Sequence, residues 1–154
     1  MSKCHVNGIR DESNIKEFST LDAPTQDLIL AAIEARKSAY CPYSNFAVGA
    51  ALRTFDDSIY TGCNIENAAF TAGICAERTA AAKAVSEGKR DFVACAVVAL
   101  QEDSFTTPCG VCRQFLIEFA KKDFPLYVTK SDLPPYRVLC TSIGELLPKR
   151  FSLT

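Results

Sequence analysis

The sequence predicts an α/β protein with three layers, in which helices cover both faces of one mixed five-stranded sheet. The segments follow in the order β-β-α-β-α-β-β, which is typical of this architecture. The segment 92–100 is apolar throughout, as expected of a strand covered on both faces. The last two strand segments are joined by only six residues, 130–135, so we expect them to be antiparallel, because a parallel crossover needs more chain.

The 154 residues fit one domain. Residues 1–20 are polar and aperiodic and are expected to form an N-terminal arm, whereas 21–154 form the single domain. A helix is expected to begin near Pro24, with Asp22 as its cap and Pro in its first turn. It ends before Pro42, which disfavours helix at the residue that precedes it.

The middle of the chain predicts a hairpin followed by a helix. Apolar residues alternate over 46–54, and a short polar turn separates them from a second strand over 59–63. Alanines at helical spacing predict a helix over 75–87, and Gly88 ends it.

A third helix is expected after Pro108, where apolar residues again recur at helical spacing. Two short strands, 126–129 and 136–140, complete the sheet.

The charge balance limits the function. There are 17 Lys and Arg against 18 Asp and Glu, which argues against a nucleic-acid-binding module and a polybasic membrane binder. No apolar run approaches the ~20 residues of a membrane helix. The N-terminus lacks the apolar core of a signal peptide, so we expect a cytoplasmic protein whose eight cysteines stay reduced.

Three of these cysteines form the strongest chemical signal. Cys109 and Cys112 lie in a C-x-x-C at the start of one predicted helix, a spacing that brings two thiolates to one metal ion. Cys75 opens another helix, and helix N-termini stabilise thiolates. Three protein ligands leave one position open for water, as in catalytic zinc sites, and zinc lowers the pKa of that water to about 7.

Two charged residues follow Cys75. On a regular helix, Glu77 would point roughly 200° away from Cys75. We therefore expect Cys75 at the non-helical cap and Glu77 facing the water, where it can move protons. Arg78 places a positive charge beside a centre that three thiolates make net negative.

Other interpretations of these cysteines remain open at this point. Cys109 and Cys112 could be a redox pair, or a fourth cysteine (Cys63, Cys95 or Cys140) could complete a structural zinc site. The only histidine, His5, lies in the polar arm, which argues against a Ser-His or Cys-His mechanism. The remaining cysteines are expected to be core or surface thiols: Cys4, Cys41, Cys63, Cys95 and Cys140.

The motifs together resemble the zinc-dependent cytidine deaminases, and among them the small homotetrameric type. The resemblance spans residues 38–151. It rests on five segments in the same order: 43–46 (Tyr-Ser-Asn-Phe), 48–50 (Val-Gly-Ala), 62–67 (Gly-Cys-Asn-Ile-Glu-Asn), 75–78 (Cys-Ala-Glu-Arg) and 108–114 (Pro-Cys-Gly-Val-Cys-Arg-Gln).

The resemblance implies zinc bound by Cys75, Cys109 and Cys112, with Glu77 as the proton shuttle. It also implies that Asn64 and Glu66 bind the ribose hydroxyls, and side chains two residues apart in extended chain do point to the same side.

Four further residues match positions around the base. Phe46 matches an aromatic residue of the base pocket, and Ala68 a backbone contact to the base. Phe70 stands where relatives often carry Tyr, which removes any hydroxyl contact there. Phe151, beyond a short helix that Pro148 should stop, matches a ring that stacks on the base bound by a neighbouring subunit.

The implied activity is hydrolytic deamination of cytidine and 2′-deoxycytidine to uridine and 2′-deoxyuridine, a reaction of pyrimidine salvage. The implied partners are the nucleoside and three further copies of the chain in a homotetramer with shared active sites, with no nucleic acid polymer and no membrane. Two alternatives remain: a deaminase of another cytosine nucleoside such as blasticidin S, and a zinc-stabilised RNA-binding module.

Overall fold

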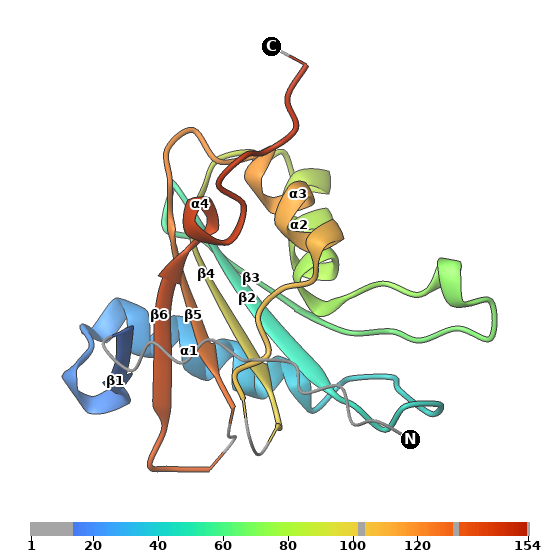
Figure 1. Cartoon of the computed structure of the whole chain (residues 1–154), viewed down its shortest axis with the longest axis horizontal. Coiled ribbons are helices and arrows are strands. Elements are labelled where there is room, and N and C mark those ends of the chain that lie inside the picture. Colours follow the sequence, from blue (N-terminus) through green and yellow to red (C-terminus); the bar gives the residue numbers. More distant parts are fainter. Residues whose placement is uncertain (1–13, 102–103, 131–132, 154) are drawn as a thin grey trace.

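The computed structural model describes residues 14–101, 104–130 and 133–153 and has one mixed sheet flanked by helices (Figure 1). None of the described helices is both long and apolar enough to cross a membrane. The elements are, in chain order, β1 (Ile15–Glu17), η2 (Phe18–Thr20), α1 (Ala23–Arg36), β2 (Val48–Thr54), β3 (Ile59–Cys63), η3 (Phe70–Ala72), α2 (Ala76–Ser86), β4 (Phe92–Ala99), α3 (Gly110–Ile117), β5 (Pro125–Thr129), β6 (Arg137–Ser142) and α4 (Ile143–Leu146).

The sheet has six strands in the order β1-β6-β5-β4-β2-β3, rather than the five that the sequence predicts. The additional strand, β1, lies in the segment assigned to the polar arm and pairs with β6 through Ile15 and Leu139. Its three residues bury little surface, so it joins the edge by backbone pairing and leaves no hydrophobic pattern to detect. The prediction for the last two strands is confirmed, because β5 and β6 are antiparallel.

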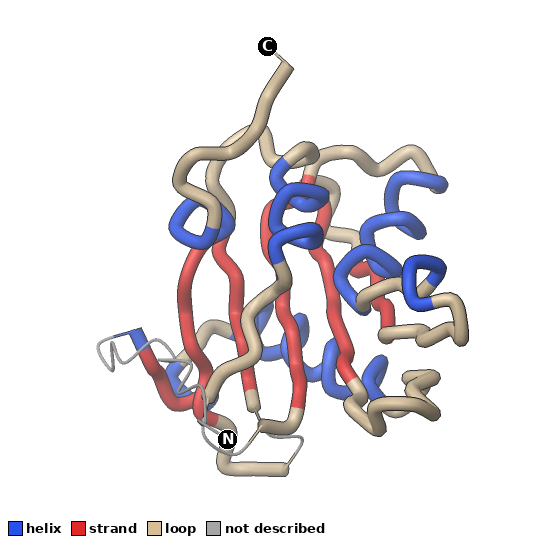
Figure 2. Tube along the Cα trace, turned by 45° about the vertical axis from the view of Figure 1, so that its right-hand side comes forward, coloured by secondary structure: helices blue, strands red, loops and turns tan. Residues whose placement is uncertain are grey.

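Helices cover both faces of the sheet, as predicted (Figure 2). On one face, Leu28 and Ile29 of α1 pack against small side chains such as Ala51 and Ala96. On the other face, the alanines of α2 and Leu116 of α3 pack against β2, β4 and β5. Both clusters are buried, so the central strand β4 is covered on both faces and is apolar along its length.

The predicted start of α1 and end of α2 are confirmed, but α1 ends at Arg36, several residues before the expected end at Pro42. Asp22 caps α1 by accepting a hydrogen bond from the Thr25 amide at 2.9 Å. Gly88 follows α2 with a φ of 83°, a left-handed conformation that suits glycine. Strand β2 begins at Val48 instead of residue 46, because Asn45 has a φ of 55° and turns the chain before the ladder starts.

Two loops on the same side of the sheet lie side by side and project from the body (Figure 1). One follows α1 and the other follows β3. The Tyr40 amide donates to the Asn64 carbonyl at 3.0 Å, and the Glu66 amide donates to the Tyr40 carbonyl at 2.7 Å. These bonds place residues 40–46 beside the segment that leads into α2.

The cap at Asp22 generates a test of pH dependence. Hydrogen bonds from Thr25 hold the pKa of Asp22 below its ordinary value of 3.8, so the ionised cap favours the folded state. We expect Asp22→Ala to lower the Tm at pH 7 by a few degrees. Since the folded pKa is depressed, this difference is present above the unfolded pKa and is lost as the pH falls below about 4.

Asp22→Asn is the matched control, because asparagine also caps helices but does not titrate. Thermal unfolding of the three proteins between pH 7 and pH 3 measures the effect. An Asp22→Ala deficit that stays constant over this range would contradict the role of the ionised cap.

Candidate functional site

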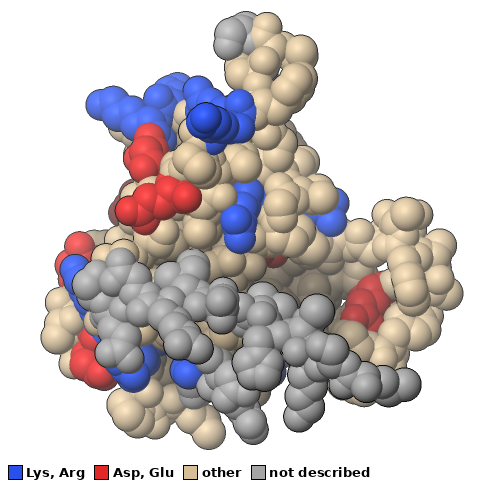
Figure 3. All heavy atoms as spheres, in the orientation of Figure 1, with Lys and Arg blue, Asp and Glu red and all other residues tan. Residues whose placement is uncertain are grey.

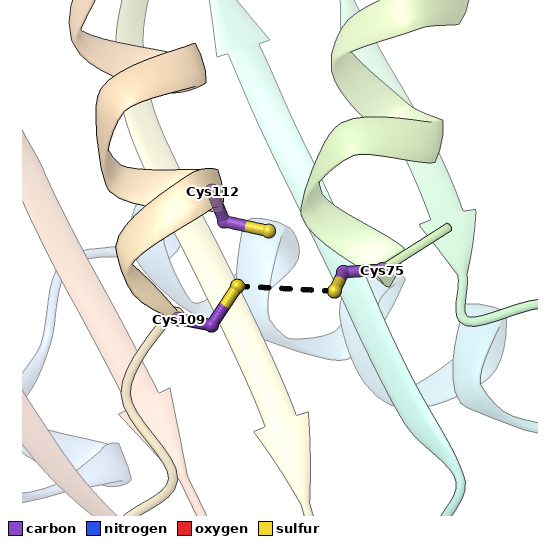
Figure 4. Close-up of side chains that lie close together, drawn as sticks. All are labelled: Cys75, Cys109 and Cys112. Atoms are coloured by element: carbon purple, nitrogen blue, oxygen red, sulfur yellow. Dashed lines mark hydrogen bonds between the residues drawn. The ribbon is translucent and has the colours of Figure 1, made fainter. Parts of the chain in front are cut away.

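Three cysteine thiols meet where α2 and α3 begin (Figure 4). Cys75 is the N-cap of α2 and Cys109 the N-cap of α3, and both have extended backbone conformations, as predicted for Cys75. Cys112 follows within the first turn of α3. The three sulfur atoms lie within 4.8 Å of one another, and the Sγ atoms of Cys75 and Cys109 are 3.9 Å apart.

The spacing of the sulfurs fits a tetrahedral metal ion. Two sulfurs bound at about 2.3 Å to such an ion lie roughly 3.8 Å from each other, close to the observed separation. Cys112 is buried, whereas Cys109 is exposed, so one side of the cluster opens to solvent. The donor set therefore suits a metal ion such as zinc that keeps one open position.

No fourth cysteine joins this group among the described residues. The cluster does not include Cys63, Cys95 or Cys140, and Cys4 lies outside the described residues. Cys63 donates to the Ser38 carbonyl at 3.2 Å, and Cys95 is fully buried in β4. The alternative of a structural four-cysteine site built on Cys63, Cys95 or Cys140 is therefore wrong.

The cluster favours a thiolate at Cys75. Hydrogen bonding from the Cys112 thiol, and then from Arg78, lowers the pKa of Cys75 to about 5 despite its partial burial. The same Cys112–Cys75 interaction raises the pKa of Cys112, because that thiol acts as the donor. One ionised thiol in the absence of metal is the expected starting point for a site whose ligands must lose protons on binding.

Glu77 and Arg78 lie beside the sulfurs with different surroundings. Glu77 is 4% exposed, and burial, reinforced by the negative charge of Cys75, raises the pKa of its carboxyl. The Nη2 atom of Arg78 donates to the Cys75 sulfur at 3.8 Å. Arg78 Nε is buried without a hydrogen-bond partner among the described residues, so the charge is held beside the thiols in spite of the cost of burial.

A cleft of about 540 Å³ opens next to the cysteine cluster, within the size range of small-molecule sites. Cys75 and Arg78 form one wall. Its other lining residues come from the two projecting loops and the start of α2: Tyr43, Ser44, Asn64, Ile65, Glu66, Asn67, Phe70, Gly73 and Ile74.

Glu66 joins the two loops across this cleft. Its carboxylate accepts hydrogen bonds from the Tyr43 amide at 2.9 Å and from the Ser44 amide at 3.2 Å, and also from the Ser44 hydroxyl. These donors, the Ser44 hydroxyl first, lower the pKa of Glu66 and keep it ionised. A fixed carboxylate at the wall of a cleft is suited to binding hydroxyl groups.

Asn64 also lines the cleft, but its side chain makes hydrogen bonds with the backbone at the start of β2. Its Oδ1 accepts from the Val48 amide and its Nδ2 donates to the Phe46 carbonyl, both at 2.8 Å. One N–H of the amide remains for a ligand. Phe46 itself is half-buried and does not line the cleft.

Of the remaining predicted residues, only Phe70 lines the cleft within one chain. Phe70 lines the cleft but is 84% exposed, and Ala68 is exposed outside the lining. Phe151 is 69% exposed and also lies outside the lining. The side-chain amide of Gln114, in α3, makes two hydrogen bonds with the backbone of Phe151: it accepts from the Phe151 amide at 3.2 Å and donates to the Phe151 carbonyl at 3.1 Å.

Sequence reasoning missed Arg113 as a support of the site. Its guanidinium donates to the Pro108 carbonyl at 2.7 Å, the Thr107 hydroxyl at 2.9 Å and the Leu146 carbonyl at 3.0 Å. It thus ties the loop before Cys109 to the end of α4. A basic residue directly after the second cysteine of the C-x-x-C was the available signal.

Comparisons with known proteins agree with this geometry. The family described as "Cytidine and deoxycytidylate deaminase zinc-binding region" matches residues 23–128. A cytidine deaminase of Sporosarcina psychrophila is 49% identical over 129 residues, which cover 82% of this chain and 90% of the relative. A cytidine deaminase of Halalkalibacterium halodurans is 46% identical over 127 residues, which cover 82% and 93%.

A solved structure shares both fold and sequence. The crystal structure of cytidine deaminase from Burkholderia pseudomallei superposes with a TM-score of 0.73 at 46% identity, covering 81% of this chain and 97% of that one. The family match contains both cysteine-bearing segments that the structure brings together. The chain therefore belongs to the cytidine and deoxycytidylate deaminase family with its zinc-binding region.

Proposed function

We propose that this protein is a zinc-dependent cytidine deaminase, which hydrolyses cytidine and 2′-deoxycytidine to uridine and 2′-deoxyuridine with release of ammonia. The observation that carries the proposal is the three-thiol centre, one of whose cysteines, Cys75, lines a cleft that also presents an ionised carboxylate, Glu66. Family membership and relatives at 46–49% identity support the same reaction.

In this proposal Cys75, Cys109 and Cys112 hold zinc. Bound there, the ion supplies the Lewis acidity that makes water a nucleophile at neutral pH. Arg78 offsets part of the negative charge of the three thiolates through its contact with Cys75. The helix N-termini at Cys75 and Cys109 add to this stabilisation.

Glu77 moves the protons. Its carboxylate takes a proton from the attacking water and delivers it to N3 of the cytosine ring as the C4–O bond forms. It then takes the remaining proton from the new hydroxyl at C4 and transfers it to the amine, so that the C4–N bond breaks, the C4 carbonyl forms and ammonia leaves. Its burial at 4% exposure keeps these protons from exchanging with bulk water during the reaction.

The cleft positions the nucleoside. Glu66 accepts hydrogen bonds from the ribose hydroxyls, and the free N–H of Asn64 donates to the same sugar. Phe70, which lines the cleft, packs beside the base. Phe46 and Ala68 lie outside the lining and would approach the base from its margin, and the Asn64 amide keeps the backbone at Phe46 in place.

The two alternatives have less support. On the face drawn in Figure 3, basic side chains gather near the C-terminal end with acidic ones beside them, and form no stripe that an RNA strand could follow. Glu66 favours a sugar with free hydroxyls over a nucleoside with a modified ribose such as blasticidin S.

We further propose a cytoplasmic homotetramer, in which Phe151 of one subunit closes the pocket of the next. The cytoplasm keeps thiols reduced, and the described cysteines form no disulfides. Exposed aromatic rings border the open side of the cleft, as expected of a surface that another copy covers: Tyr43, at 55%, and Phe70, at 84%.

The roles of Glu77 and the cysteines are separable. We expect Glu77→Gln to abolish turnover but keep stoichiometric zinc, because Glu77 transfers protons and is not a ligand. Cys109→Ser and Cys112→Ser should both lower zinc occupancy. Ammonia release and metal analysis of the three variants measure this. Loss of zinc in Glu77→Gln, or full occupancy in both cysteine variants, would contradict the assignment.

Glu66→Gln tests sugar recognition. We expect the KM for cytidine to rise about tenfold or more with little change in the fold, because a charge-assisted hydrogen bond is lost. For the same reason free cytosine, which lacks the sugar, should be a poor substrate of the unmodified enzyme. Initial rates from the loss of ultraviolet absorbance give both values. Equal kcat/KM for cytosine and cytidine would refute sugar binding by Asn64 and Glu66.

Subunit mixing tests the shared pocket. Phe151→Ala should lower kcat/KM roughly ten- to a hundredfold, because a ring that stacks on the base is lost. Mixed tetramers of Phe151→Ala and Glu77→Gln subunits should regain activity at pockets that combine an intact zinc site with an intact tail. If refolded mixtures form tetramers but gain no activity over the separate variants, Phe151 does not complete a neighbouring pocket.

A further inference from the structure

Two glycines in adjacent strands mark the closest approach of helices to the sheet. Gly49 of β2 lies opposite Cys63 of β3, and Gly62 lies opposite Ala50. Gly62 faces α2, whereas Gly49 faces α1 on the other side of the sheet. Neither glycine has a positive φ, so the backbone conformation itself does not require glycine at these positions.

Space, however, does require glycine at residue 62. A Cβ atom there would lie 2.4 Å from both the Ala76 carbonyl oxygen and the Ala80 amide nitrogen, and 2.9 Å from Thr79 Cβ. Two of these neighbours are backbone atoms of α2, which cannot rotate away. The helix would have to retreat by about 1 Å to restore ordinary contact at 3.4 Å.

The part of α2 that contacts Gly62 is its first turn, which holds the residues of the proposed active site. Cys75 caps it, Glu77 lies within it, and the Thr79 hydroxyl donates to the Cys75 carbonyl at 3.2 Å. The strand that bears Gly62 continues directly into Asn64 and Glu66 of the cleft. The contact therefore links the metal-binding helix with the segment that lines the cleft.

We propose that Gly62 is a positioning residue, whose missing side chain sets where the first turn of α2 lies and so brings the Cys75 sulfur to Cys109 and Cys112. The proposal rests on the three-cysteine centre of the proposed function. A shift of about 1 Å is large compared with a 3.9 Å separation between two sulfurs that must bind one ion. Enlarging residue 62 therefore weakens the metal site without touching any ligand.

Gly49 provides a matched control. A Cβ there would lie 2.1 Å from the Ala32 carbonyl oxygen and 2.6 Å from the Arg36 amide, both in the backbone of α1. The steric conflict is at least as severe, and it occurs in the neighbouring strand. Helix α1 carries none of the cysteines and none of the cleft-lining residues.

The experiment compares metal binding in the metal-free wild-type protein, Gly62→Ala and Gly49→Ala. Each protein is titrated with Co²⁺, whose thiolate charge-transfer and ligand-field bands report the coordination directly, and competition with a chelator gives the affinity. We expect both variants to have a lower Tm. Only Gly62→Ala should also lose Co²⁺ affinity, by about ten- to a hundredfold, with altered ligand-field bands.

The outcomes are distinct. Wild-type affinity and spectrum in Gly62→Ala, or equal losses of affinity in the two variants, would overturn the positioning role. Failure of the wild-type protein to give thiolate bands would instead overturn the three-cysteine centre itself, and the proposal with it.

A second pair of variants decides the matter if Gly62→Ala does not fold even with Co²⁺. Lys83 of α2 donates to the Thr61 carbonyl at 2.6 Å, so Lys83→Met loosens the same helix from the same strand without adding bulk. We expect a loss of Co²⁺ affinity of about two- to fivefold. Lys121→Met, which breaks the ion pair of the exposed Lys121 with Asp91, should show none. Equal affinities in these two variants would overturn the proposal.

Discussion

The site depends on one constraint: α2 and α3 must begin next to each other on the same face of the sheet. Cys75 and Cys109 are both N-caps, and an N-cap residue has an extended backbone that swings its side chain beyond the helix end. Both sulfurs can therefore approach to 3.9 Å while the helices pack side by side through buried alanines and Leu116. The sheet supplies the rigid base, because β4 and β5 run parallel and α3 connects them.

Three thiols that ionise close together concentrate negative charge. Of the two charged residues beside them, Arg78 offsets this charge and Glu77 does not. Arg78 donates a hydrogen bond to the Cys75 sulfur. Its Nε is buried and has no hydrogen-bond partner in the described part of the chain, which is energetically unfavourable. Glu77 is almost completely buried, and burial disfavours the charged form of its carboxyl and so raises its pKa. Such groups stabilise the fold poorly in the metal-free state, which is typical of sites shaped by function rather than by stability.

The cleft beside the three cysteines is held by polar contacts between loops rather than by a core. Glu66 binds the backbone of Tyr43 and Ser44, and Asn64 binds the backbone on either side of residue 47. These bonds keep two projecting loops in register although their apolar side chains are largely exposed. A single chain therefore forms the walls of the cleft at the cysteines and at Glu66, but leaves the side near Phe70 open.

The three-layer fold, the helix starts and the antiparallel final pair of strands could be predicted from the sequence, because each has a local signature in periodicity, capping or spacing. The same holds for the grouping of Cys75, Cys109 and Cys112. The sequence did not reveal β1, whose pairing is made by backbone groups and buries little. Only the tertiary structure showed that no fourth described cysteine joins the cluster, that Arg113 supports the Cys109 loop, and that Gly62 sits against α2. Each of these is a distance between residues far apart in the chain, and such distances are decided by how helices pack on the sheet.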